Sequence, residues 1–426
     1  MVGVFEKEAS SSSHALDEAA GESPLLLPLH GAGPQQQGQG KGRHLSSQPK
    51  TFANVFIAIV GAGVLGLPYT FMRTGWAAGL AVLLGVAALT FHCMMLLVRT
   101  RRRLEPCKIA SFGDLGMAVS GPLGRLAVDS MIVLSQAGFC VGYLIFICNS
   151  LAHLLPSLPK PSFVLAMLPF QLALNSVRSL TLLAPISIFA DLVDLGAMGV
   201  VLGQDLSVLA SAPPPVRACG SPAALLYGVG VAVYAFEGIG MVLPLEAEAA
   251  DKPRFGRALA LSMAFIAAMY GLFGALGYLA FGDDTRDIIT TNLGPGWLTV
   301  LVQVGLCVNL FFTMPVMMNP VYEVAERWAC GNRYCWWLRW ALVAAVSAAA
   351  VAVPNFADFL SLVGSSVCVV LGFVLPAAFH LKVLGPDMGW PGVAADVAVV
   401  VLGIVLAVSG TWSSLSQILF PPEVSS

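Results

Sequence analysis

The chain has 426 residues, of which 57% are hydrophobic and only 11% are charged, and its mean hydropathy is +0.81. Soluble domains carry about 25% charged residues, so this composition excludes an ordinary soluble enzyme or nucleic-acid-binding protein and indicates that the chain lies in a lipid bilayer. The net charge of -2 is uninformative, but the positions of the charges are not.

The first 50 residues differ in composition from the rest. Segments such as GPQQQGQGKG at 33–42 cannot bury apolar surface, so residues 1–50 are predicted to form a disordered cytoplasmic tail. Glu22, Leu26 and Leu27 form an acidic dileucine pattern similar to those that sorting adaptors bind. We therefore expect an adaptor to bind the tail and direct the chain to a vacuolar or lysosome-like membrane.

Residues 51–416 are predicted to form the transmembrane domain, because a spanning helix needs about 20 apolar residues. The expected spans are 52–72, 76–98, 125–149, 162–176, 184–203, 223–245, 257–281, 297–318, 338–353, 358–381 and 392–415. The sequence thus predicts an all-α membrane protein with eleven transmembrane helices.

Basic residues indicate which side of the membrane is cytoplasmic. Many of them lie in the loops after the second, sixth and eighth predicted spans, namely Arg99, Arg101, Arg102, Arg103, Lys252, Arg254, Arg327 and Arg333. The loop GDDTRD at 282–287, on the opposite side, is acidic. We therefore expect a cytoplasmic N-terminus and a lumenal C-terminus.

The first predicted span contains a glycine motif that also occurs in nucleotide-binding turns. Residues 61–66 read GAGVLG, which matches G-x-G-x-x-G. A dinucleotide site also needs an acidic residue about 20 positions later, and the sequence has none between Thr51 and Leu104. Pro68 would also disrupt the helix behind the phosphates. Two explanations remain: close helix packing, or a helix break that lines a substrate site.

The sixth predicted span contains a similar interruption. Residues 234–244 read YAFEGIGMVLP, so G-x-G is again followed by a proline. Five spans separate the two motifs, and the two spans cross the membrane in opposite directions. Glycine- and proline-interrupted helices in matching places of two inverted halves indicate a transporter site. Glu237, a carboxylate at mid-membrane, supports a functional role for this segment.

These motifs resemble the amino acid/auxin permease family, which belongs to the amino acid–polyamine–organocation superfamily. The segments that carry the resemblance are 61–68 (GAGVLGLP), 92–94 (HCM), 175–180 (NSVRSL) and 237–246 (EGIGMVLPLE). They are most similar to the plant vacuolar neutral amino-acid exporters and also to the proton-coupled amino-acid transporters. The resemblance covers about residues 50–415. It implies a leucine-transporter-like fold with five-plus-five inverted repeats, broken helices 1 and 6, and secondary transport of amino acids.

A zwitterionic amino acid needs a partner for each of its charges inside the membrane. We expect the backbone amides of Gly61, Ala62 and Gly63 to bind its carboxylate, because a helix N-terminus is electropositive. Carbonyl groups near Phe236 and Gly238 are expected to accept hydrogen bonds from its ammonium group. The Phe236 ring is also a candidate for a gate.

Coupling to protons requires a titratable side chain on the pathway. Glu237 has three possible roles: pairing with the ammonium group, carrying a proton, or tying the broken helix ends together in its protonated form. Asn54 occupies a place where proton-coupled animal relatives carry histidine, and asparagine does not titrate near neutrality. This departure favours the plant vacuolar branch. His92 is either a packed side chain or a proton relay.

Asn309 and Ser365 either line the pathway or make helix–helix hydrogen bonds. No metal or cofactor motif is present, and no HExxH or GxSxG enzyme motif. The sequence therefore predicts a secondary carrier of neutral amino acids that exports them from the vacuole to the cytosol, with protons as a candidate coupling ion. The alternative is an amino-acid-sensing receptor on the same fold.

Overall fold

The computed structural model describes residues 46–104, 109–177, 184–211 and 214–419, with no side-chain description for 184–192. All of these residues belong to the second of two compact units, residues 43–426. The sorting residues Glu22, Leu26 and Leu27 lie outside the described residues.

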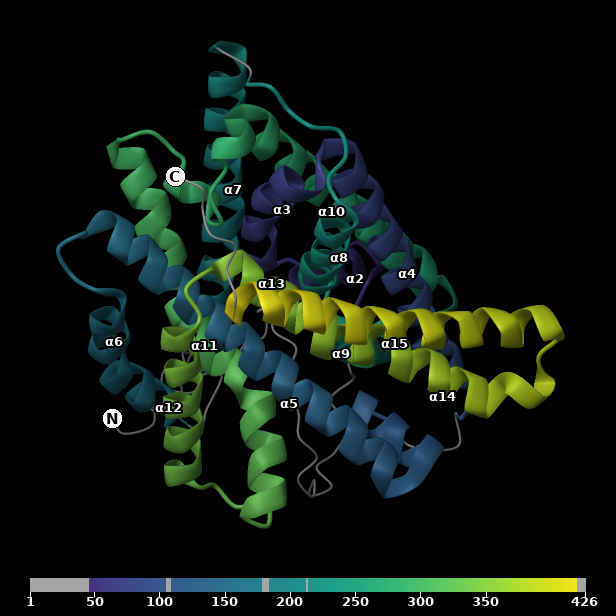
Figure 1. Cartoon of the computed structure of the whole chain (residues 1–426). Coiled ribbons are helices and arrows are strands. Elements are labelled where there is room, and N and C mark those ends of the chain that lie inside the picture. The colour runs from purple at the N-terminus through teal and green to yellow at the C-terminus, as the bar shows by residue number, and fades with distance from the viewer. Residues whose placement is uncertain (1–45, 105–108, 178–183, 212–213, 420–426) are drawn as a thin grey trace, which may run out of the picture. The chain divides into compact units, whose positions relative to one another are not determined.

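Helices form almost all of the described chain (Figure 1). They are α2 (Gln48–Ile59), α3 (Leu67–Thr74), α4 (Trp76–Arg103), α5 (Phe112–Leu154), α6 (Lys160–Asn175), α7 (Ala184–Ser211), α8 (Pro222–Ala235), α9 (Ile239–Glu248), α10 (Phe255–Phe281), α11 (Trp297–Ala329), α12 (Trp336–Ala352), α13 (Phe356–Val363), α14 (Leu375–Leu384) and α15 (Trp390–Leu419). The only β-type pairing among these residues is a bridge between Ser46 and Ala249.

Eight helical segments of the described chain are long and apolar enough to cross a membrane, and the bent pair Gln48–Ile59 and Ala62–Thr74 makes a ninth. α15 shows why lipid must be the solvent, because only 17% of its most apolar window is buried inside the protein. Val401, Val405 and Val408 are among its exposed side chains. The predicted all-α membrane fold is confirmed at this level.

Both predicted helix interruptions are present. In the first span, α2 ends at Ile59, Gly61 is extended (φ -157°, ψ -166°), and a 3-10 helix over Ala62–Gly66 leads into α3 at a bend of 53°. In the sixth span, α8 ends at Ala235 and α9 begins at Ile239.

Other spans differ from the sequence prediction in their limits. The third was expected at 125–149, but α5 begins at Phe112, where Ser111 and Asp114 form a capping box. Gly121 (φ 65°, ψ -154°) is not helical, so α5 consists of two helical pieces joined at a kink, and the second, longer piece begins after Gly121, close to the predicted start at 125. The tenth span is not uniform, because π-helical turns at Gly364–Cys368 and Val370–Val374 separate α13 from α14.

The broken spans lie at the centre of the helix contacts. α8 packs against α3, α4 and α13, while α10 packs against α2, α3 and α4 (Figure 1). Close approach depends on small residues: a Cβ at Gly364 would collide with the carbonyl oxygen of Gly230 in α8. The contacts therefore hold both interruptions inside the protein, away from lipid.

Candidate functional site: the paired helix breaks

The two helix breaks contact each other. A Cβ on Gly63 would lie 2.9 Å from the Cα of Ala235, and a Cβ on Gly238 would lie 2.8 Å from Cγ1 of Ile59. Real Cβ atoms do not approach so closely, so glycine is required at both positions. The breaks in the first and sixth spans, far apart in sequence, are thus in direct contact.

Gly61 has a different environment from Gly63. A Cβ on Gly61 would meet no atom within 4 Å, and its extended backbone is one that any residue can adopt. Gly61 caps the 3-10 helix that starts at Ala62, and the first amides of a helix have no intrahelical acceptor. The open space at the Cβ position of Gly61 is next to the start of this 3-10 helix, and a helix start is a place where an anionic group can bind.

The opposite side of the site is formed by carbonyl groups, some of which already have partners. The Gly238 carbonyl accepts a hydrogen bond from the Met241 amide at 3.1 Å. The Ile59 carbonyl accepts one from the Tyr270 hydroxyl at 3.4 Å. The Phe236 ring is fully buried, with its centroid 5.2 Å from that of Tyr270. Phe236 and Tyr270 therefore pack together beside the breaks.

Glu237 lies in the break between α8 and α9 and is partly exposed. Its backbone amide donates to the Tyr234 carbonyl at 3.3 Å. No described residue forms a hydrogen bond or ion pair with its carboxylate. In this conformation the side chain does not tie the helix ends together and is available to a ligand or a proton.

Asn309 makes a helix–helix contact. Its amide nitrogen donates to Oδ1 of Asp194 in α7 at 2.6 Å, and its side-chain oxygen accepts from the Thr313 hydroxyl at 3.0 Å. Asn309 is buried. Asn309 therefore makes helix–helix hydrogen bonds, which is one of the two roles expected from the sequence.

Ser365 is not brought to the breaks. Its hydroxyl donates to the Ser361 carbonyl at 2.7 Å. Its Cβ faces α15, where a Cβ on Gly410 would lie 2.6 Å away. Asn54 lies half-buried on α2, and His92 lies half-buried on α4 in the electrostatic range of Asp396 rather than beside Glu237.

Asp205 was not singled out by the sequence analysis. It lies on α7 with no exposed surface, and neither carboxylate oxygen has a hydrogen-bond partner. Its place in an apolar helix is the signal that could have identified it, because intramembrane charges are costly and usually functional. The predicted span 184–203 ended just before this residue.

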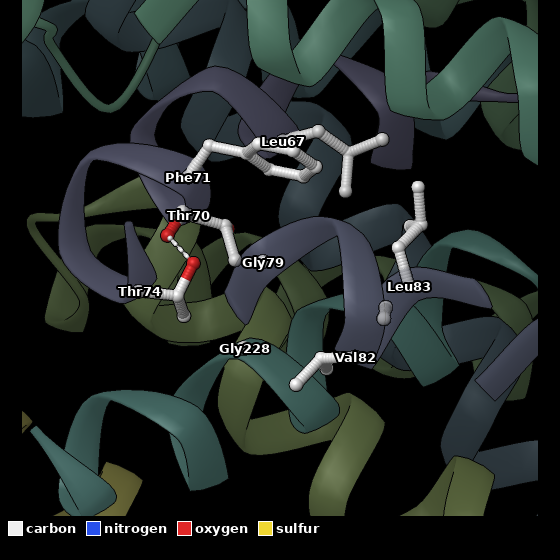
Figure 2. A pocket seen from close by; sticks show the side chains of 9 residues that line it. Leu67, Thr70, Phe71, Thr74, Gly79, Val82, Leu83 and Gly228 are labelled. Carbon is white, nitrogen blue, oxygen red and sulfur yellow. Dashed lines mark hydrogen bonds between the residues drawn. The ribbon is translucent and has the colours of Figure 1, made fainter. Parts of the chain in front are cut away.

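Two hollows lie outside the breaks. Figure 2 shows the first, between α3, α4 and α8, lined by Leu67, Thr70, Phe71 and Leu83 among others. It leaves no volume for a water molecule and is a packing seam. The second has a volume of about 260 Å³ and is lined by residues of α5, α6 and α12 with the segment around Pro354. Neither is lined by residues 61–63 or 236–238.

Ionic contacts close the α3 end of the site. Arg73 pairs with Asp358 of α13 at 3.1 Å and stacks over the Tyr227 ring at 4.0 Å. Asp287, in the loop after α10, accepts a hydrogen bond from the Phe356 amide at 3.0 Å. Burial raises the pKa of Asp287, while that hydrogen bond and the charge of Lys160 lower it to a smaller extent.

Equivalent contacts close the opposite end. Glu246 on α9 is only 2% exposed and pairs with Arg101 at 2.5 Å and Arg102 at 2.9 Å, both on α4. Ser46, just before α2, bridges to Ala249, just after α9. Both broken spans are therefore held at their ends as well as at their centres.

Two helices that break at mid-span and meet inside a bundle define a membrane carrier of the broken-helix type. Solved structures have a similar fold: the structure matches an inward-facing structure of Mhp1 with a TM-score of 0.56 and 14% identity, covering 88% of this chain and 90% of that one. It also matches Mhp1, a nucleobase-cation-symport-1 family transporter, closed with bromovinylhydantoin bound (TM-score 0.55, 16% identity, 88% and 92% covered).

The chain belongs to the transmembrane amino acid transporter protein family, whose model matches residues 44–416. Amino acid transporter AVT3B of Arabidopsis thaliana is 61% identical, with 89% of this chain and 95% of that one covered. Amino acid transporter AVT3C of the same plant is 58% identical (97% and 98% covered). Vacuolar amino acid transporter 3 of Saccharomyces cerevisiae is 27% identical (89% and 58% covered). The family resemblance is confirmed, and the chain is a transporter rather than an enzyme.

Proposed function

We propose that this protein is a secondary active carrier of neutral amino acids in the vacuolar membrane and that it exports them to the cytosol. One observation carries the proposal: the two breaks touch through Gly63 and Gly238, and open space lies beside Gly61. The first amides of the 3-10 helix have no intrahelical acceptor and attract a carboxylate, and nearby carbonyls and Glu237 suit an ammonium group. The relatives are named as amino acid transporters, one of them as vacuolar, which supports the substrate class and the membrane.

The proposed topology has eleven spans in two inverted halves of five, with the N-terminus in the cytoplasm and the C-terminus in the lumen. Arg101 and Arg102 at the end of α4 support the orientation, because basic residues favour the cytoplasmic side. The end closed by Arg101, Arg102 and Glu246 is then cytosolic, and the Arg73–Asp358 end is lumenal. In the tail, Glu22, Leu26 and Leu27 are proposed to bind a sorting adaptor.

The amino-acid-sensing receptor alternative gains no support from these relatives, which are named as transporters. Counterflow of labelled alanine and a panel of other amino acids into proteoliposomes tests transport directly. We expect saturable counterflow of neutral amino acids, with weak competition by lysine and glutamate. A purified protein that binds alanine but does not move it would instead support the receptor.

Coupling to protons is proposed to use Glu237, because it is at the breaks and its carboxylate has no partner among the described residues. We expect Glu237→Gln to retain exchange of labelled alanine and to lose accumulation driven by a pH gradient. Asp205→Asn is the matched second variant, since that carboxylate is buried and unbonded. Wild-type accumulation in Glu237→Gln together with loss in Asp205→Asn would move the coupling role to Asp205.

A further inference from the structure

A histidine–aspartate pair is buried where the last two described helices meet. Nδ1 of His380 on α14 lies 2.6 Å from Oδ2 of Asp396 on α15, and the two side chains are 5% and 3% exposed. The helix that carries His380 ends at Leu384, and α15 begins at Trp390. The pair therefore lies one to two turns inside the hairpin, within apolar helix, and its residues belong to neither of the two breaks.

The surroundings of the pair include two further titratable groups. α4 packs against α14, and its His92 and Cys93 both lie within electrostatic range of Asp396. Arg99, also on α4, is an electrostatic neighbour of His92. Asp396 is the only charged residue of α15. The titratable neighbours that α4 brings to the pair are thus His92 and Cys93, and Arg99 is a neighbour of His92.

The other charged groups near the hairpin turn point elsewhere. Arg103 pairs with Asp387 at 2.6 Å, and both side chains are largely exposed. Lys382 on α14 donates to the Ser120 hydroxyl of α5 at 3.1 Å and is also exposed. These solvated groups do not neutralise Asp396, so His380 is its sole direct partner among the described residues.

A proton changes the net charge of this pair inside the bilayer. With a neutral imidazole, the pair carries the uncompensated charge of Asp396, and an uncompensated buried charge is costly. A proton on His380 makes the pair neutral overall and converts its contact into a charge-assisted hydrogen bond, which is stronger. Histidine is the side chain that ordinarily changes charge between pH 5 and 8.

A continuous segment links this pair to the helix breaks. From α14 the chain runs back through the π-helical turns at 364–374 to α13, and α13 contacts both α8 and the 3-10 helix of the first span. π-Helical turns are rare and concentrate at functional sites. A movement of α14 relative to α15 can therefore be transmitted along this one span to α13, which contacts the residues next to the helix breaks.

We propose that His380 and Asp396 form a proton-binding site, separate from the substrate site, whose occupancy sets the pH dependence of transport. The last part rests on the proposed transport function, whereas proton binding by the pair does not. The bound proton strengthens the contact between α14 and α15, and its release at higher pH weakens that contact.

A double-mutant cycle at two pH values tests proton binding. Melting temperatures of purified wild type, His380→Gln, Asp396→Asn and the double variant are measured at about pH 5 and pH 8, the range of histidine titration. We expect the effects of the two substitutions on the melting temperature to be clearly non-additive at the lower pH. At the higher pH this non-additivity should decrease clearly. Equal coupling at both values would identify a static hydrogen bond and overturn the proposal.

Transport supplies a second readout. Labelled alanine counterflow is measured with equal pH inside and outside the proteoliposomes. We expect a wild-type rate that differs by about threefold or more across the histidine range, and a flatter profile in His380→Gln and Asp396→Asn. His153→Gln, on α5, is the matched control and should keep the wild-type profile. Unchanged profiles in both pair variants would contradict the regulatory role.

The two proposals fail in different ways. A wild-type protein that moves no amino acid would refute the transport function, while the melting cycle would still report on the pair. If neither single variant gives folded protein, the milder variant His380→Asn takes their place, because it cannot ionise, and its melting temperatures are compared with those of wild type and His153→Gln at the same two pH values. A wild-type melting temperature that does not vary across this pH range would contradict proton binding.

Discussion

At the scale of single residues, the two glycines of the first break have separate roles. Gly63 has no room for a side chain, because a Cβ would lie 2.9 Å from the Ala235 Cα and 3.0 Å from the Tyr234 ring. Gly61 has open space. The sequence motif treats these positions alike, so their difference could only come from the packing of the sixth span.

We expect Gly63→Ala to destabilise the protein by about 1–3 kcal/mol, as for other overpacked cores. The melting temperature of the purified variant measures this effect. Gly85→Ala on α4, where a Cβ would meet no atom within 4 Å, is the control and should melt like the wild type or slightly higher. An undisturbed melting temperature in Gly63→Ala would show that the breaks do not pack as described.

Asp287 gives a prediction about pH. Burial raises its pKa, so the folded state holds this proton more tightly than the unfolded state, and the contribution of Asp287 to stability decreases as pH rises. Asp287→Asn keeps an oxygen acceptor for the Phe356 amide but cannot ionise. We expect wild type to gain more stability than Asp287→Asn when the pH falls from about 7.5 to about 3.5, just below the ordinary pKa of aspartate, measured by thermal melting. A larger gain in stability for Asp287→Asn than for wild type would contradict this prediction.

At the scale of elements, the sequence predicted the interruptions of the first and sixth spans because glycine and proline act locally on the backbone. It did not predict the first part of α5, which begins at a capping box and is separated from the longer spanning part by the kink at Gly121. It also missed the π-helical turns of the tenth span. Such features depend on contacts with other helices, which hydrophobic periodicity does not contain.

The candidate site could be predicted in part for the same reason. Gly61, Gly63 and Gly238 were identified by their pattern and lie together. Ser365 was chosen for its chemistry alone, and the structure turns it toward α15. Asp205 lay just beyond the predicted span 184–203. The His380–Asp396 pair went unnoticed because two polar residues on different helices do not reveal their contact or their burial in the sequence.

The Arg73–Asp358 contact joins α3 to α13 and should restrain both. Its side chains are 24% and 17% exposed, so we expect Asp358→Asn to cost about 1 kcal/mol and to speed hydrogen–deuterium exchange in Phe356–Val363. The Arg217–Asp283 pair is 59% and 68% exposed, and Asp283→Asn is therefore the matched control. Equal exchange in both variants would show that the partly buried pair does not hold α13.

At the scale of the whole molecule, the protein has contacts at both ends of its broken spans. Arg101, Arg102 and Glu246 hold one end, and Arg73 with Asp358 holds the other. The breaks lie between them and are supported by α10 and α13. Transport by this arrangement requires the two ends to open in turn while the breaks keep the substrate.

Equilibrium binding of labelled alanine to purified wild type, Gly61→Ala and Gly85→Ala tests the paired breaks most directly. The added methyl group at Gly61 would enter the space assigned to the substrate carboxylate without touching the protein. We expect at least about tenfold weaker binding by Gly61→Ala, or about 1.4 kcal/mol, with a wild-type melting temperature and normal binding by Gly85→Ala. Wild-type affinity in a folded Gly61→Ala protein would contradict a substrate site at the breaks.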